Sequence, residues 1–321
     1  MRIARWMRGD LLEEGVVTDG GVIALEVTVN DLLRMGLTRA LALGGAATGA
    51  PTPLADVTLL APIVPTSIRD FVAFEEHVEG ITASVDGASE VVPEWYEYPT
   101  FYFTNPHSVI ATGDAVVPPA TERLDFELEV GAVIGAVDSS DGRNLDPASA
   151  ADHIFGYTIF NDWSARDLQG REMKVRLGPA KGKDFATTLG PWIVTADEFA
   201  DLVDDEGFLP LVLEVDVNGQ RIGSDMLSNM GWPFGDLIAY ASRNSRVVPG
   251  DVLGSGTAGN GGCLAELWGR RGALTPPPLV TGDEVVMRVE RIGEIRNTIH
   301  SAPAVPEIPP ARVRSRARSR S

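Results

Sequence analysis

The segment from Leu124 to Val137, with the sequence LDFELEVGAVIGAV, constrains what this chain can fold into more than any other. At a period of two, its first apolar side chains fall on one face of a strand, and Asp125, Glu127 and Glu129 fall on the other. Neighbouring carboxylates on a poorly hydrated face repel each other, and a divalent cation with hard oxygen ligands relieves that repulsion. The alternative is an edge strand with one solvated face, and the segment alone leaves both interpretations open.

The charge balance excludes several classes of partner. The 321 residues include 45 Asp and Glu against 27 Lys and Arg, which gives a formal net charge of -18. So acidic a chain is not expected to bind nucleic acid or an anionic membrane as its main partner. No apolar run of about 18 residues is present, and the N-terminus lacks the apolar region of a signal peptide. Because Cys263 is the single cysteine, no disulfide forms within the chain, and a cytoplasmic location is expected.

Three parts are expected along the chain. Residues 1–60 are expected to form a small N-terminal domain, with a strand over 22–29 and a helix over 30–43 that Asn30 or Asp31 caps. Residues 61–300 are expected to form a larger domain. Residues 301–321 are rich in Pro and Arg and are expected to be a disordered tail.

The larger part is predicted to be mainly β with some α, an α+β class, because most of its signals are turns between apolar runs. Asn218-Gly219 is a hairpin signal, and three Gly-Asp turns each precede an apolar run, at 113–114, 250–251 and 282–283. A helix is predicted over 233–242. Another is predicted over 67–80, where Ser67 and Asp70 give a capping-box start and Phe71, Phe74 and Val78 have helical spacing.

A second segment, GYTIFNDWSARDLQ, runs from an apolar strand into Asp162, which either projects from the strand end or caps the following helix. NDWSARDLQ, preceded by FELEVGAVIG and followed by LGPAKGKDFATTLGPW, closely resembles the fumarylacetoacetate hydrolase family. The resemblance extends from about Phe71 to Thr298 and includes the later motifs GSGT and LAELWG.

This resemblance implies a fold, a metal site and an oligomeric state. The implied fold is the mixed β-sandwich roll of the family behind a small N-terminal domain, and most relatives are homodimers. Glu127, Glu129 and Asp162 match the metal ligands of the family. Lys183 matches its active-site lysine, and Glu266 matches a glutamate that assists the catalytic base. The remaining matched positions line the substrate site in relatives, and they are Arg166, Gln169, Thr187 and Thr257.

Two histidines compete for the role of catalytic base. His107 aligns with the base of the fumarylacetoacetate hydrolases, which have a metal-binding aspartate seven residues earlier, where this chain has Thr100. His77 stands where the acylpyruvate hydrolase and oxaloacetate decarboxylase branch carries a histidine on a lid helix, but Gly80 replaces the glutamate three residues on. A surface or capping role is the alternative for each. Thr100 favours His77.

The matched residues predict metal-dependent hydrolysis of a C–C bond in a β-diketo or acylpyruvate-type acid, a small-molecule substrate. Mg²⁺ is the expected cofactor, with Mn²⁺ or Ca²⁺ as alternatives. A second interpretation is a lyase, decarboxylase, isomerase or dehydratase that acts on a 2-oxo acid through a metal-bound enolate. A third is a non-catalytic dimeric scaffold, which the retained charges of the site and of Lys183 argue against.

Overall fold

The carboxylate-bearing segment forms the short strand β9 (Leu124–Asp125) and the strand β10 (Leu128–Ile134) in the computed structural model, which describes residues 1–86 and 91–311. β10 pairs antiparallel with β11 (Ile154–Asp162) on one side and with β16 (Val252–Gly254) on the other. Every residue of β10 is buried. The edge-strand interpretation is therefore wrong, because both flanks of β10 carry a hydrogen-bonded neighbour.

β10 belongs to an 11-stranded sheet whose longest path of pairing is β3-β2-β1-β13-β11-β10-β16-β5-β6, while β4 pairs with β1 and β7 with β13. The pairs β16–β5 and β13–β7 are parallel and the others are antiparallel, so the sheet is mixed. The further bounds are β1 (Arg2–Arg8), β2 (Leu11–Thr18), β3 (Gly21–Ala24), β4 (Thr58–Leu59), β5 (Ile68–Phe71), β6 (Phe101–Thr104), β7 (Val109–Ile110) and β13 (Thr187–Thr195).

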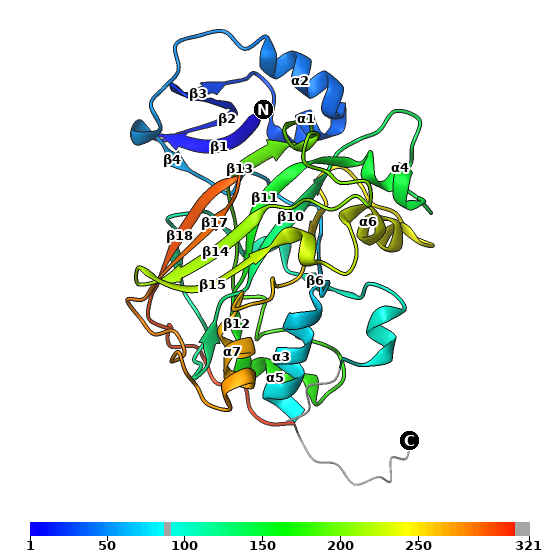
Figure 1. Ribbon diagram of the computed structural model, residues 1–321. Coiled ribbons are helices and arrows are strands. Elements are labelled where there is room, and N and C mark those ends of the chain that lie inside the picture. Colours follow the sequence, from blue (N-terminus) through cyan, green and yellow to red (C-terminus); the bar gives the residue numbers. More distant parts are fainter. Residues whose placement is uncertain (87–90, 312–321) are drawn as a thin grey trace, which may run out of the picture.

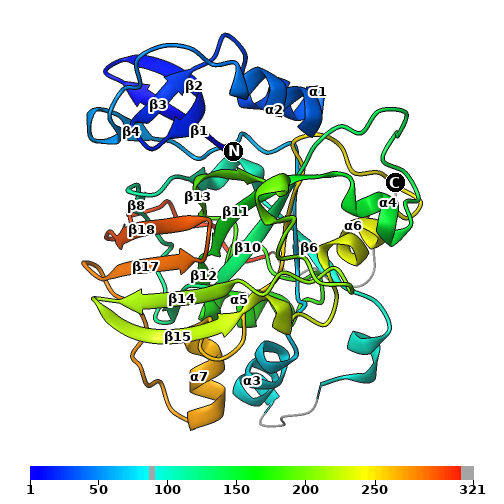
Figure 2. The same ribbon diagram turned by 45° about the horizontal axis from the view of Figure 1, so that its top comes forward.

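A five-stranded sheet lies beside the first (Figure 2) and has the order β15-β14-β17-β18-β8. Its strands are β8 (Ala115–Val116), β14 (Val212–Val217), β15 (Gln220–Met226), β17 (Glu284–Val289) and β18 (Gly293–Ile299). One apolar cluster joins the two sheets, since it contains Leu128 and Val130 of β10 together with Leu213 of β14 and Met287 of β17. β9 pairs with β12 (Ser164–Ala165) in a separate two-stranded ladder.

The helices form three groups around the sheets, and α4 and α6 pack together at one side (Figure 1). α1 and α2 lie near the N-terminus, whereas α3, α5 and α7 lie at the opposite end, where α3 packs against α7. The bounds are α1 (Val29–Met35), α2 (Leu37–Gly45), α3 (Glu75–Asp86), α4 (Pro147–Ala151), α5 (Arg166–Met173), α6 (Phe234–Ser242) and α7 (Leu264–Arg271). Short 3-10 helices are η1 (Leu54–Asp56), η2 (Pro93–Tyr96), η3 (Pro106–Ser108), η4 (Ala196–Phe199) and η5 (Leu227–Asn229).

The α+β class predicted from the sequence is confirmed. Asn218-Gly219 links β14 to β15, and the three Gly-Asp turns precede β8, β16 and β17. The helix predicted over 233–242 is α6. Among the described residues, no helix is long and apolar enough to cross a bilayer. Of the expected disordered tail, residues 301–311 contain neither helix nor strand, and residues 312–321 lie outside the described part.

The N-terminal segment differs from its prediction in two details. The strand is shorter, ending at Ala24, and the single predicted helix is two helices that break at Gly36, whose φ is +82°. The cap of α1 is Thr28, which forms a capping box with Asp31. Gly36 is needed there, because a Cβ at this position would lie 2.6 Å from the carbonyl oxygen of Ala136.

The helix predicted over 67–80 is wrong in its first half. Residues 68–71 form β5, and α3 begins only at Glu75. Ser67 caps no helix, because its hydroxyl donates to Asp251 Oδ1 at 2.8 Å. Asp70 is consequently a strand residue, and the parallel pairing of β5 with β16 sets it beside Gly254.

Candidate active site

Four carboxylates converge where β11, β10, β16 and β5 follow one another in the larger sheet. Asp70 comes from β5, Glu127 precedes β10, Glu129 lies in β10 and Asp162 ends β11, and all four are buried. One carboxylate oxygen from each of Asp70, Glu127 and Asp162 lies within 4.8 Å of the others. Gly254 leaves room for this arrangement, because a Cβ there would lie 2.6 Å from Asp70 Oδ1 and 2.8 Å from Glu129 Oε2.

Two buried cations contact this carboxylate cluster (Asp70, Glu127, Glu129 and Asp162). Lys183 Nζ contacts Glu127 Oε2 and lies 2.6 Å from Asp162 Oδ2. Arg166 lies 2.7 Å from Glu127 Oε1 and 2.8 Å from Asp125 Oδ2. Both cations therefore contact Glu127, and Lys183 also contacts Asp162. Asp70 and Glu129 form no such ion pair with these two cations.

The pKa values follow from this uneven compensation. Burial raises the pKa of Asp70 to about 6, and burial together with the neighbouring carboxylates raises the pKa of Glu129 above its usual range. Burial would also raise the pKa of Glu127, but the charges of Arg166 and Lys183 lower it instead. Burial opposes the charged form of Lys183, yet Asp162 and Glu127 raise its pKa above the usual value. Lys183 is thus an ammonium facing ionised Glu127.

The donor set fits a divalent cation. Asp70 Oδ1 and Asp162 Oδ1 are buried and have no hydrogen-bond partner in the described part of the chain. A buried anionic oxygen without a partner is unfavourable unless a cation or a proton compensates it. Hard carboxylate oxygens suit Mg²⁺, Mn²⁺ or Ca²⁺.

The other positions matched at the substrate site surround these carboxylates. Thr257 Oγ1 lies 3.3 Å from Glu129 Oε1, and Gln169 Oε1 accepts a hydrogen bond of 3.1 Å from Arg166. Thr187 pairs with Asp162 between β13 and β11, and its buried hydroxyl has no partner among residues 1–86 and 91–311. Of the three expected metal ligands, Glu127 and Asp162 belong with Asp70 to the group whose oxygens lie within 4.8 Å of one another. Glu129 is not in that group and lies beside Asp70 at Gly254.

The two candidate histidines lie in different environments. His77 is on α3 and is 7% exposed. The charges of Glu127, Arg166 and Lys183 contribute to the pKa of its imidazole. Burial lowers its pKa to about 4, so its imidazole is neutral at pH 7. His107 is exposed in η3, where its backbone N–H donates to the Asn105 side chain. His77 is thus buried where the charge of Glu127 acts on it, whereas His107 is exposed.

Glu266 lies buried on α7, against α3. Its Oε1 is 2.9 Å from Arg270 and accepts a hydrogen bond of 3.3 Å from the Gly261 N–H. Burial raises its pKa to about 7. Gly80 of α3 faces it, since a Cβ at Gly80 would lie 2.4 Å from Glu266 Cγ. The acylpyruvate branch carries a glutamate at this position. Here the position is Gly80, and its lack of a side chain allows α3 to approach α7 closely.

Two residues of the site were missed from the sequence. Asp70 supplies the fourth carboxylate, and the Tyr102 hydroxyl lies 3.0 Å from Asp70 Oδ2 and also contacts Asp162 Oδ2. A signal for Asp70 existed, because it precedes His77 by the seven residues expected between a metal-binding aspartate and a histidine base. Asp125, which shares a face with Glu127 at period two, instead accepts hydrogen bonds from the first N–H groups of α7 at Leu264 and Ala265.

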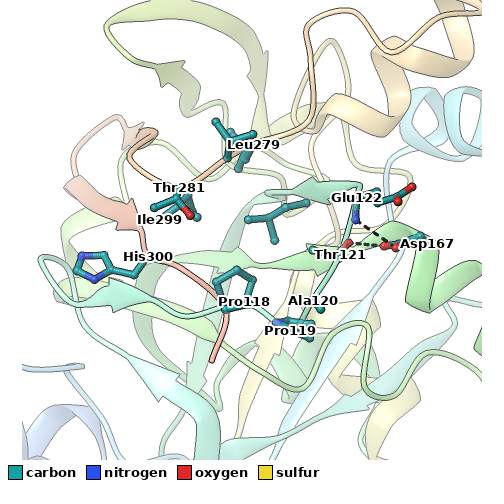
Figure 3. A pocket seen from close by; sticks show the side chains of 13 residues that line it. Pro118, Pro119, Ala120, Thr121, Glu122, Asp167, Leu279, Thr281, Ile299 and His300 are labelled. Carbon is teal, nitrogen blue, oxygen red and sulfur yellow. Dashed lines mark hydrogen bonds between the residues drawn. The ribbon is translucent and has the colours of Figure 1, made fainter. Parts of the chain in front are cut away.

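A cavity of about 360 Å³ leads toward the lysine side of the cluster, lined by Tyr102, Phe103, Thr104 and Lys183 among others. A larger cavity of about 600 Å³ lies elsewhere (Figure 3), between Pro118, Leu279 and His300. Its Asp167 accepts hydrogen bonds from Thr121 and Glu122, and the described residues that line it include none of the four clustered carboxylates. The smaller cavity is therefore the candidate substrate site.

Known proteins resemble the chain in sequence and in fold. The family described as "Fumarylacetoacetate (FAA) hydrolase C-terminal" matches residues 66–300. The fumarylacetoacetase of Arabidopsis thaliana is 31% identical over 67% of this chain, which spans 61% of that protein's length. An oxaloacetate tautomerase of Bacillus subtilis is 29% identical over 77% of this chain and 74% of its own. The maleylpyruvate hydrolase of Sphingobium sp. SYK-6 has been solved in complex with manganese(II) and pyruvate. Its superposition has a TM-score of 0.66 at 23% identity and covers 94% of this chain and 100% of that chain. This similarity supports a shared fold.

Proposed function

The chain belongs to the fumarylacetoacetate hydrolase family, and from this membership and the site geometry we propose that it is a divalent-metal-dependent hydrolase that cleaves a C–C bond of a β-diketo or acylpyruvate-type acid. The observation that carries the proposal is the carboxylate cluster, with oxygens of Asp70, Glu127 and Asp162 within 4.8 Å of one another. The manganese and pyruvate of the related maleylpyruvate hydrolase agree with this assignment.

Asp70, Glu127, Glu129 and Asp162 would hold the metal, which supplies Lewis-acid stabilisation of substrate oxygens when bound. Lys183 offers a compact positive charge to the substrate carboxylate or to a developing oxyanion. Its place in the lining of the smaller cavity supports this role, because a substrate bound there lies against a surface that includes Lys183. Tyr102, in the same lining, adds a hydroxyl donor beside Asp70 and Asp162.

His77 would act as the general base. In hydrolysis it takes a proton from water as the water oxygen bonds to the substrate carbonyl carbon. The C–C bond then breaks, its electron pair remains on the departing carbon as an enolate, and the proton returns to that carbon. The neutral state of His77 at pH 7 supports this role, because a protonated imidazole could not accept the proton.

The tautomerase relative favours a second candidate, an isomerase that moves a proton on a 2-oxo acid without adding water. Both reactions use the same base and the same enolate stabilisation, so the residues of the cluster serve either. They differ in the fate of water. Cleavage products made in ¹⁸O-labelled water carry the label in a new carboxylate, whereas an isomer made by proton transfer gains none there.

Acetylpyruvate and oxaloacetate are suitable probes for the chain stripped of metal and then supplied with Mg²⁺ or Mn²⁺. We expect pyruvate release from acetylpyruvate that chelator abolishes and either metal restores. Glu129→Gln should bind metal weakly and stay inactive, because it removes one anionic ligand. Full activity of chelated Glu129→Gln would contradict the metal site. Oxaloacetate tautomerisation without cleavage of acetylpyruvate would favour the isomerase instead.

We also propose that the chain acts as a homodimer, as the family resemblance implies. Light scattering of the purified protein would test this, and a monomer with full activity would contradict it.

A further inference from the structure

Cys263 begins α7 and contacts the candidate base His77, and the proposed reaction assigns it no role. It is the N-cap of α7, it is fully buried, and its Sγ accepts a hydrogen bond of 3.4 Å from the Glu266 N–H. The same Sγ lies 3.7 Å from Nδ1 of His77, across the α3–α7 interface. Among the described residues this is the hydrogen bond of the His77 ring, because Glu266 Oε1 contacts Gly261 and Arg270 and Glu266 Oε2 has no hydrogen-bond partner.

Which nitrogen of a neutral histidine carries the proton is decided by the partner of the other nitrogen. An imidazole N–H is a stronger donor than a thiol S–H, and burial raises the pKa of Cys263, so the sulfur remains a neutral thiol. Sulfur can accept from both the Glu266 N–H and His77 Nδ1–H. The reverse arrangement, with S–H donating to Nδ1, would put the ring proton on Nε2 and remove the lone pair that a base needs.

We infer that Cys263 is a positioning residue that holds His77 in the Nδ1–H tautomer and so keeps the lone pair of Nε2 free to take a proton from water or substrate. The inference rests on the proposed role of His77 as the base. It adds that a sulfur atom, and not the Glu266 carboxylate, orients that base in this chain.

The tautomer can be observed directly, without activity, by NMR of protein labelled with ¹⁵N in its histidine rings. The four histidines of the chain keep the spectrum simple. His153 is an internal reference, because its Nδ1 lies 3.3 Å from the Gly135 carbonyl oxygen and must donate there. We expect wild-type His77 to show the same Nδ1–H pattern as His153. An Nε2–H pattern at His77 in the wild type would overturn the inference.

Two variants separate positioning from helix capping. Cys263→Ala removes both contacts of the sulfur. Cys263→Ser keeps a good N-cap for α7, but its shorter C–O bond moves the acceptor away from Nδ1. In both variants we expect the His77 proton to move to Nε2, the form that neutral imidazole favours in water, while His153 is unchanged.

We expect kcat of Cys263→Ser to fall by about tenfold with KM nearly unchanged, a part of what a general base contributes. Its melting temperature should stay close to that of the wild type. A variant spectrum that keeps Nδ1–H at His77 would show that Cys263 only caps the helix. If instead the tautomer moves but His77→Gln retains full turnover, the proposed base is wrong and the positioning by Cys263 stands.

Discussion

The two buried cations of the site contact only some of its carboxylates, and this uneven distribution indicates which carboxylates depend most on a metal. Arg166 binds Asp125 and Glu127, and Lys183 binds Glu127 and Asp162. Asp70 and Glu129 have neutral donors instead, from Tyr102, Gly256 and Thr257. Metal binding should therefore depend most on Asp70 and Glu129, which form no ion pair with a cation of the described chain.

Asp70→Asn is expected to weaken binding of Mn²⁺ by at least about tenfold, because it removes one anionic ligand and leaves the backbone of β5 intact. The matched control is Asp167→Asn, since Asp167 bonds Thr121 and Glu122 outside the carboxylate cluster. Titration calorimetry with Mn²⁺ measures both. Equal affinities of the two variants would contradict the assignment of Asp70 as a ligand.

Metal affinity should fall as the pH is lowered. Burial raises the pKa of Asp70 to about 6 in the metal-free protein, and the pKa values of Glu129 and Asp162 shift in the same direction. The proton on Asp70 favours the folded metal-free state below pH 4, and this contribution is lost as the pH rises through about 6. Metal must displace that proton, so the Asp70 proton alone should lower affinity by about tenfold per pH unit below 6, and protons on Glu129 and Asp162 add to this fall.

Calorimetry in two buffers of different ionisation enthalpy measures the protons released with the metal. Release should be greater at pH 5.5 than at pH 8, and smaller in Asp70→Asn than in the wild type. An affinity that stays constant from pH 5 to 8 would refute the raised pKa values.

The two histidines should differ in turnover. His77→Ala is expected to lose about a hundredfold or more in kcat while its metal affinity stays intact, because His77 lies beside the cluster without contacting a ligand oxygen. His107→Ala is expected to cost much less, since that ring is exposed in η3. Steady-state kinetics on acetylpyruvate, with His77→Gln as a bulkier second variant, checks the ranking. The opposite ranking would identify His107 as the base.

At the scale of elements, the contact of α3 with α7 fixes where the base stands. Gly80 lies three residues after His77, and a Cβ there would lie 2.4 Å from Glu266 Cγ and 3.1 Å from Glu266 Cα. The second distance involves the backbone of α7, so a rotamer change of Glu266 does not relieve it. Any larger residue at this position must push α3 away from α7, and His77 moves with it.

Gly80→Ala is therefore expected to lower the free energy of unfolding by about 1–3 kcal/mol, the usual cost of overpacking. Gly170→Ala is the matched control, because Gly170 lies in α5 with no heavy atom within 4 Å of its Cβ position. That variant should be unchanged or up to about 1 kcal/mol more stable. Denaturant unfolding of both variants measures the difference. A Gly80→Ala variant as stable as the wild type would mean that the helices can separate freely.

Local sequence patterns predicted the elements whose partners are close in sequence. The Asn218-Gly219 hairpin and the Gly-Asp turns were correct because their geometry depends on the turn residues themselves. Ser67 and Asp70 misled because their partners, Asp251 and Gly254, lie more than 180 residues away. The ligands recognised from the sequence lie in distinctive motifs, whereas Asp70 enters the site only through the parallel pairing of β5 with β16.

At the scale of the whole molecule, the N-terminal segment shares its sheet and core with the rest. β1 pairs with β13 at Arg2–Val194 and Ile3–Ile193, and the amino group of Met1 lies 2.7 Å from Thr195 Oγ1. One apolar cluster contains both N-terminal side chains and side chains of the central strands, and its members include Ile3, Leu32, Leu33, Val133, Phe155 and Phe160. A second cluster, of Ala4, Trp6, Val17 and Val22, lies within residues 1–60, and Trp192 of β13 packs against it.

We expect the metal-loaded protein to unfold in a single calorimetric transition, because the N-terminal segment cannot unfold without exposing apolar side chains of β10 and β11. Leu33→Ala should lower the temperature of that whole transition, since truncating a buried leucine costs about 2–5 kcal/mol. Leu54→Ala is the matched control within the same segment, because Leu54 is 39% exposed in η1, and it should leave the transition in place. Both variants are compared at saturating Mg²⁺ so that metal binding stabilises them equally. Two transitions, of which Leu33→Ala shifts only one, would instead show that residues 1–60 unfold as an independent domain.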